Sequence, residues 1–158
     1  MRRYGHLAGA AGALLLAAAC QQGSTDVLIF QAQLRGENEV PPRVTAASGA
    51  CGFSQEGGTV YYSIETHGLT TITGAHVHSG APGVNGPIRV GFFFSSAATP
   101  TRSVSDGVIL EGSFTAANVT GVTFDQLLEQ MRTGAAYCNV HSPTFPGGEI
   151  RGPVLAAP

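Results

Sequence analysis

Apolar and polar residues alternate one by one over several short stretches of the chain, and this alternation constrains the fold more than any other feature. Successive side chains of a β-strand point to opposite faces, so a period of two is typical of strands with one buried face. Clusters of Gly, Pro, Asn and Ser separate the stretches, as turns require. The pattern predicts an all-β fold, an antiparallel β-sandwich of short strands. Strands are predicted at 27–34, 59–67, 87–94 and 108–114, with turns or loops at 36–38, 54–58, 79–87, 95–107 and 142–148.

The alternation also assigns individual side chains to the two faces of a strand. Val108 is placed on the core face of the strand predicted last, and Phe92 and Phe94 share the core face of the strand before it. Phe93 then points the other way. There it either packs beneath a helix or forms an exposed apolar patch that would suit a protein partner.

One short helix interrupts the strands. Thr123 and Gln126 have the spacing of a capping box, an apolar stripe follows, and Gly134 provides the stop. We predict one short helix over residues 124–132, packed across an edge or end of the sandwich.

The charge of the chain excludes two broad classes. Charged residues make up 11% of the sequence, against about 25% in an average soluble domain. The net charge is −2 and the chain has only eight basic residues, so no basic surface is available for a nucleic-acid partner. With 43% hydrophobic residues the chain is too apolar for intrinsic disorder. Its 158 residues suit one domain with a real core.

The first residues have the form of an export signal. Arg2 and Arg3 precede an apolar run, and three alanines at 17–19 form a small-residue cleavage site. The run is shorter than the roughly 20 residues of a permanent membrane helix. We therefore interpret residues 1–19 as a signal peptide. Its removal would leave six arginines against ten acidic residues, a net charge of −4.

Cys20 follows the alanines directly, and the string at 16–20 resembles a bacterial lipobox, in which this cysteine becomes the lipidated N-terminus. The alternative is ordinary cleavage that leaves Cys20 as a free thiol. We favour lipidation, because exported proteins seldom keep an exposed unpaired cysteine. Residues 20–26 would then be a polar tether. Gln21 is not the Asp that is associated with inner-membrane retention, so we expect the outer membrane, with the domain facing the periplasm or the surface.

Two cysteines remain after the leader, Cys51 and Cys138. Export would place them in an oxidising compartment, where a single pair has only one intramolecular connectivity. Both fall on the apolar parity of strand-like stretches. We expect a buried disulfide; two inert thiols and metal ligation are the alternatives, and the absence of a CxxC pattern argues against the metal.

Three motifs together identify a family resemblance. They are Gly-Glu-Asn-Glu-Val-Pro-Pro at 36–42, the stretch at 74–88 that contains His-Val-His, and the stretch at 137–152 that ends in Gly-Gly-Glu-Ile-Arg-Gly. In this order and spacing the chain resembles the CHRD domain, named for chordin, over residues 27–154. Cys138 departs from the pattern, in which an aliphatic residue is more usual.

The resemblance implies a fold more than a function. It implies an immunoglobulin-like β-sandwich, and bacterial members are commonly single-domain exported proteins or lipoproteins. No catalytic activity or cofactor is established for the bacterial domains as a class, and a fold by itself does not settle function.

His76, His78 and His141 are the candidate metal ligands. His76 and His78 are separated by one residue, so on a strand they project from the same face. If Val77 and Val140 enter the core, all three histidines lie on the outer faces of their strands. On neighbouring strands they could hold Cu²⁺ or Zn²⁺, with Glu149 or a water as a further ligand.

The alternative role of the histidines is structural. Imidazole can donate and accept a hydrogen bond at once, which suits side chains that anchor the loops at 79–87 and 142–148. The sequence leaves both roles open and favours the structural one.

No catalytic constellation is apparent in the sequence, so we expect no enzyme and no catalytic residues. Glu37 and Glu39 share parity, but the two prolines that follow indicate an extended edge, and no nucleophile elbow is present. Two functions follow. The first is a non-enzymatic, lipid-anchored binding or structural module of the bacterial envelope, without a cofactor and with a membrane and a protein as partners. The second is a copper- or zinc-binding protein.

Overall fold

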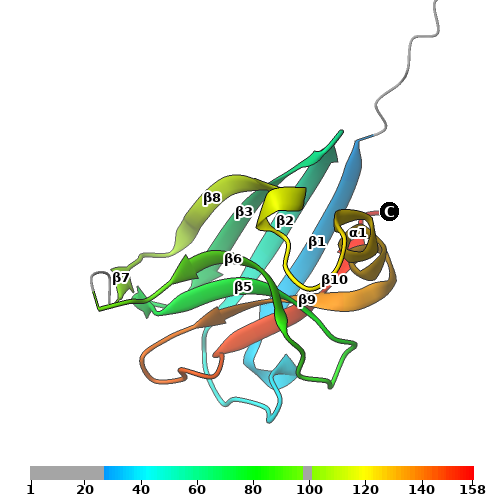
Figure 1. Cartoon of the computed structure of the whole chain (residues 1–158). Helices are drawn as coiled ribbons and strands as arrows, with labels where there is room; N and C mark the ends of the chain where they lie inside the picture. Colours follow the sequence, from blue (N-terminus) through cyan, green and yellow to red (C-terminus); the bar gives the residue numbers. More distant parts are fainter. Residues whose placement is uncertain (1–26, 98–100) are drawn as a thin grey trace, which may run out of the picture.

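A computed structural model describes residues 27–97 and 101–158 and shows a β-rich domain with one α-helix in those ranges (Figure 1). The signal peptide predicted at 1–19 and the lipidation site predicted at Cys20 lie outside the described residues. The elements are β1 Leu28–Arg35, η1 Gly36–Asn38, β2 Ser48–Glu56, β3 Thr59–His67, β4 Thr71–Ile72, β5 Gly74–Ser79, β6 Ile88–Phe94, β7 Arg102–Ser103, β8 Gly107–Thr115, η2 Ala116–Asn118, α1 Phe124–Thr133, β9 Gly134–His141 and β10 Ile150–Ala156.

The predicted alternation is confirmed where strands form. In β1 the residues Phe30, Ala32 and Leu34 are buried while their neighbours Gln31 and Gln33 are exposed. The same alternation of buried and exposed side chains gives the sheet one apolar face. This face encloses the core.

Eight strands form one continuous antiparallel sheet in the order β6-β5-β9-β10-β1-β2-β3-β8. The sheet curls so far that its two edge strands, β6 and β8, come into contact and nearly close a barrel. In Figure 1, β5, β6 and β9 run across β1, β2 and β3. The all-β class is confirmed. The immunoglobulin-like sandwich of two separate sheets is not, because β1 pairs with β10 on one side and β2 on the other.

A β-bulge makes one sequence assignment wrong. Ile64 pairs with Leu110, but the next residue of β3, Glu65, pairs with Val108, so β8 has an extra residue at this point. The extra residue, Ile109, is buried and turns Val108 to the outside, where it is 56% exposed. A bulge shifts side-chain parity by one, which simple alternation does not foresee.

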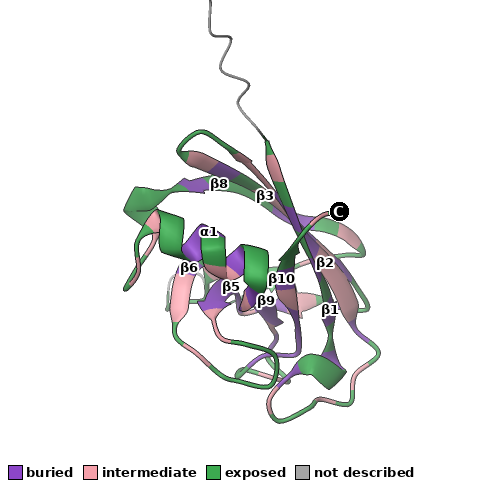
Figure 2. Ribbon diagram, turned by 90° about the vertical axis from the view of Figure 1, so that its right-hand side faces the viewer, coloured by how far each residue is buried: buried purple, intermediate pink, exposed green. Residues whose placement is uncertain are grey.

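The helix is confirmed almost to the residue: α1 spans Phe124–Thr133, one residue beyond the predicted end. The Thr123 hydroxyl accepts from the Gln126 backbone N–H, and the Gln126 side chain accepts from the Thr123 backbone N–H. Gly134 ends the helix at a φ of 75°, which glycine adopts without strain. The helix lies over β9 and β10, and its buried residues are the purple bands of its ribbon in Figure 2. No helix of the described ranges is both long and apolar enough to cross a membrane.

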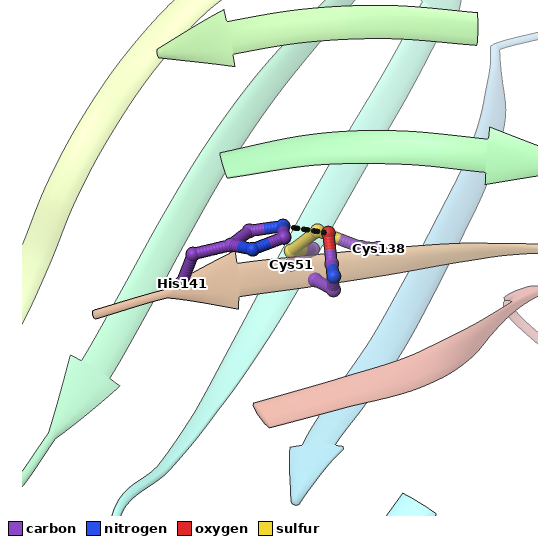
Figure 3. The surroundings of a disulfide bond; sticks show 4 residues. Cys51, Cys138 and His141 are labelled. Carbon is purple, nitrogen blue, oxygen red and sulfur yellow. Dashed lines mark hydrogen bonds between the residues drawn. A yellow bond between two sulfur atoms is a disulfide. The ribbon is translucent and has the colours of Figure 1, made fainter. Parts of the chain in front are cut away.

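A disulfide joins Cys51 of β2 to Cys138 of β9, as expected (Figure 3). Two strands, β10 and β1, separate β9 from β2 in the sheet. The bond therefore crosses the core and links two regions of the curled sheet. Both sulfurs belong to buried residues.

We predict that loss of this disulfide lowers the free energy of unfolding by about 4 kcal/mol, because the bond closes a loop of 87 residues and limits the unfolded chain. The measurement is guanidinium denaturation of the oxidised protein and of the Cys51→Ala, Cys138→Ala double variant. Equal unfolding midpoints and slopes would contradict the prediction.

Candidate metal site

Alternation within β5 and β9 places the three candidate histidines on the outer face of the sheet. These strands pair directly, with His76 opposite Asn139 and Gly74 opposite His141. Val77 and Val140 point into the core and are fully buried. The parity assigned to the histidines from sequence is correct.

The outer face at this point is nonetheless covered. His76 is only 5% exposed and His78 only 8%. We call the buried polar side chains gathered here the outer polar layer; it consists of Glu39, His76, His78, Asn139 and Arg151. Strand parity alone places the His-x-His pair on the outer face and does not show how deeply loops bury it.

The structure brings the three histidines together. The Nδ1 atom of His76 is 3.1 Å from the Nε2 atom of His141. One ring nitrogen from each of His76, His78 and His141 lies within 4.8 Å of the other two. A triangle of that size has a point about 2.8 Å or less from every corner (4.8 Å divided by √3). Shifts of less than about 1 Å would bring the nitrogens to the 2.0–2.1 Å of a zinc–imidazole bond.

Glu149 is not brought into this cluster. Its carboxylate accepts hydrogen bonds from the hydroxyls of Thr45 and Ser142. The sequence suggestion that Glu149 completes the ligand set is therefore not supported. Glu37 and Glu39 do not form a carboxylate pair either, because Glu37 is exposed and Glu39 is buried 3.9 Å from the Arg151 guanidinium.

Two of the histidines also anchor loops, as the structural role requires. The Nδ1–H of His78 donates to the carbonyl of Gly86 at 2.9 Å, and the Nδ1–H of His141 donates to the carbonyl of Pro146 at 2.9 Å. Carbonyl oxygens only accept, so both hydrogens are on Nδ1. In the neutral rings each Nε2 then carries the lone pair instead of a hydrogen, the form in which imidazole binds metals.

Burial keeps these rings neutral. It lowers the pKa of His76 to about 3, with a further contribution from the neighbouring His141 and His78. Burial also lowers the pKa of His78 and of His141, although the Gly86 and Pro146 carbonyls oppose the shift. Protonation is thus disfavoured at all three positions.

Two of the lone pairs have no hydrogen-bond partner. The His141 Nε2 atom accepts from the Nδ1–H of His76, which leaves the lone pair of His76 on Nε2. The Nε2 atoms of His76 and His78 are buried and have no partner among residues 27–97 and 101–158. An unsatisfied buried acceptor costs about 1–3 kcal/mol. A metal ion would use these lone pairs, and an ordered water would also satisfy them.

Aromatic residues to which the sequence analysis gave no role at the site pack against the rings. Tyr137 stacks on His78 with centroids 4.7 Å apart, and the Arg151 guanidinium lies 4.6 Å from the Tyr137 centroid. Phe94 lies 4.5 Å from the His76 ring. Its assignment to the core face is wrong, because β6 has an extra residue, Phe92, opposite the link between Ala75 and His76.

The bulge reverses the sides of Phe93 and Phe94, whereas Phe92 keeps the core face that the sequence assigns to it. Phe92 and Phe93 both pack against the core, whereas Phe94 is exposed on the outer side. Phe93 is therefore not the exposed patch considered from the sequence.

Comparison with known proteins confirms the resemblance seen in the motifs. The family model of the CHRD domain matches residues 30–154. The chain belongs to the CHRD domain family. No curated protein and no solved structure matches this CHRD protein significantly.

All three motifs of the CHRD domain contribute to the outer polar layer. The first motif provides Glu39, the second provides His76 and His78, and the third provides Asn139 and Arg151. The motifs are distant in sequence but meet on one face of the sheet, over β5, β9 and β10.

We predict that the metal-free protein loses stability as the pH falls from 6.5 towards 3. A histidine whose pKa is lowered by folding binds a proton more readily when unfolded, so acid favours unfolding below the ordinary pKa of 6.5. In urea denaturation with EDTA, His76→Gln should reduce the slope of unfolding free energy against pH by up to about 1.4 kcal/mol per pH unit. An unchanged slope would contradict the prediction.

Proposed function

We propose that this protein is an exported, lipid-anchored module of the bacterial envelope that has no enzymatic activity and acts through its CHRD domain. The family supports a non-enzymatic module, since its model matches nearly all of the chain after the predicted leader. The leader and the lipobox-like string before Cys20 support export and anchoring. The membrane and an envelope protein are the proposed partners.

The observation that supports a binding role is the way the outer polar layer fixes several loops at once. Besides the two loops anchored by histidines, the Asn85 amide donates to the Val40 carbonyl at 3.0 Å. The guanidinium of Arg151 in turn donates to the Asn85 side-chain oxygen at 2.8 Å. Loops held in this way form a surface that loses little conformational entropy when it binds a partner.

We predict that Cys20→Ser moves the protein from the membrane fraction to the soluble periplasmic fraction and abolishes labelling by a fatty-acid analogue, because the thiol that receives the lipid is lost. Cell fractionation with immunoblotting measures the distribution. The Cys51→Ala, Cys138→Ala variant is the matched control and should remain membrane-bound. A Cys20→Ser protein that stays in the membrane fraction would exclude the lipid anchor.

A second candidate function is copper or zinc binding at His76, His78 and His141. The observation that favours it is the pair of buried, unpartnered Nε2 atoms within a cluster of neutral imidazoles. Imidazole binds both metals, and the general affinity order places Cu²⁺ above Zn²⁺. Storage or delivery of the metal would fit a module without catalytic residues.

We predict stoichiometric binding of Cu²⁺ or Zn²⁺ to the EDTA-treated protein, measured by isothermal titration calorimetry and by metal analysis of protein purified from the periplasm. His141→Ala should weaken binding by tenfold or more, on the order of the loss seen even for supporting residues of metal sites. His67→Ala, which removes an exposed histidine outside the cluster, is the control. Equal affinity in wild type and His141→Ala would exclude the site.

A further inference from the structure

Asn139 lies beside the histidine cluster. It is 3% exposed, lies on β9 directly opposite His76 of β5, and its side-chain oxygen is 3.1 Å from the Nε2 atom of His141. The third candidate ligand, His78, lies opposite Tyr137, two residues before Asn139 on the same strand. One amide is therefore next to two of the three candidate ligands.

No hydrogen lies between the Nε2 atom of His141 and the side-chain oxygen of Asn139, so the contact is not a hydrogen bond. The neutral His141 ring carries a single hydrogen, and the Pro146 carbonyl accepts it at Nδ1. The Nε2 lone pair of His141 then faces both the Nδ1–H of His76, from which it accepts, and the Asn139 Oδ1 atom, so two acceptors lie 3.1 Å apart. A cation between them would turn this repulsion into two coordination bonds. A rotated amide that donates from Nδ2 would also remove it, and this arrangement needs no metal.

We propose that Asn139 is a fourth metal ligand, whose amide oxygen joins the three imidazole nitrogens in an N₃O site for a divalent ion, Zn²⁺ or Cu²⁺. The inference rests on the metal-binding function proposed above and adds to it both a ligand and a selectivity. An amide oxygen is a hard, neutral ligand, whereas Cu⁺ is selected by soft thiolate and thioether ligands. The cluster contains neither a thiolate nor a thioether. Asn139 therefore favours divalent ions over Cu⁺.

The surroundings of Asn139 support a fixed ligand. Its strand, β9, is paired on both sides, with β5 through His76 and with β10 through Arg151. The next residue towards the N-terminus is Cys138, which the disulfide holds against β2 (Figure 3). The backbone of Asn139 is thus held by two strands and a covalent bond, and such positioning lowers the cost of arranging the ligands.

The test compares Asn139→Ala and Asn139→Asp with wild type by titration of the EDTA-treated protein with Zn²⁺, Cu²⁺ and, under reducing conditions without oxygen, Cu⁺. Asn139→Ala should weaken Zn²⁺ and Cu²⁺ binding by about tenfold or more and leave Cu⁺ binding unchanged. Asn139→Asp replaces the neutral oxygen with an anionic one and should tighten the binding of divalent ions by a similar factor. Asn118→Asp, on the exposed turn after β8, makes the same charge change away from the cluster and should alter neither affinity.

The outcomes separate this inference from the function on which it rests. Absence of metal binding in wild type would overturn both. Wild-type binding with the same Zn²⁺ affinity in Asn139→Asp would overturn the role of Asn139 and leave the three-histidine site intact. Circular dichroism of each metal-free variant verifies folding. If Asn139→Ala fails to fold, the near-isosteric Asn139→Asp decides the question alone.

Discussion

In β9 one face is apolar and the other carries polar and aromatic side chains, and this difference determines the arrangement of the whole candidate site. On its inner side Ala136, Cys138 and Val140 are fully buried, so the strand cannot slip by one residue without placing polar groups in the core. The outer side must then present Tyr137, Asn139 and His141. The apolar core thus fixes which polar groups meet on the other face.

The two roles considered for the histidines use different atoms of the same rings. The Nδ1–H groups of His78 and His141 hold loops through backbone carbonyls, and this fixes the tautomer in which Nε2 carries a lone pair. Hydrogen bonds of this kind from the second ring nitrogen are general among metal-binding histidines. Loop anchoring and metal binding are therefore compatible, and the anchoring contacts would orient the ligands in advance.

The local features of the fold could be predicted from the sequence, and its long-range features could not. The strand alternation, the capping box at Thr123, the stop at Gly134 and the side of the sheet that carries the histidines follow from neighbouring residues. The bulges that turn Val108 and Phe94 outward depend on how two strands pair. The burial of the histidines and the position of Asn139 beside them depend on loops closing from three distant motifs. No local pattern encodes these contacts.

The position of β9 in the sheet also determines when the histidine cluster can form during synthesis and folding. This strand lies between β5 and β10, so the middle of the sheet is built from one of the last segments of the chain. A chain that emerges N-terminus first holds His76 and His78 long before the residues that complete their surroundings are available. Such long-range pairing is slow to form. The cluster therefore assembles only in the finished molecule, and an exported chain would meet metal ions in the compartment where it folds.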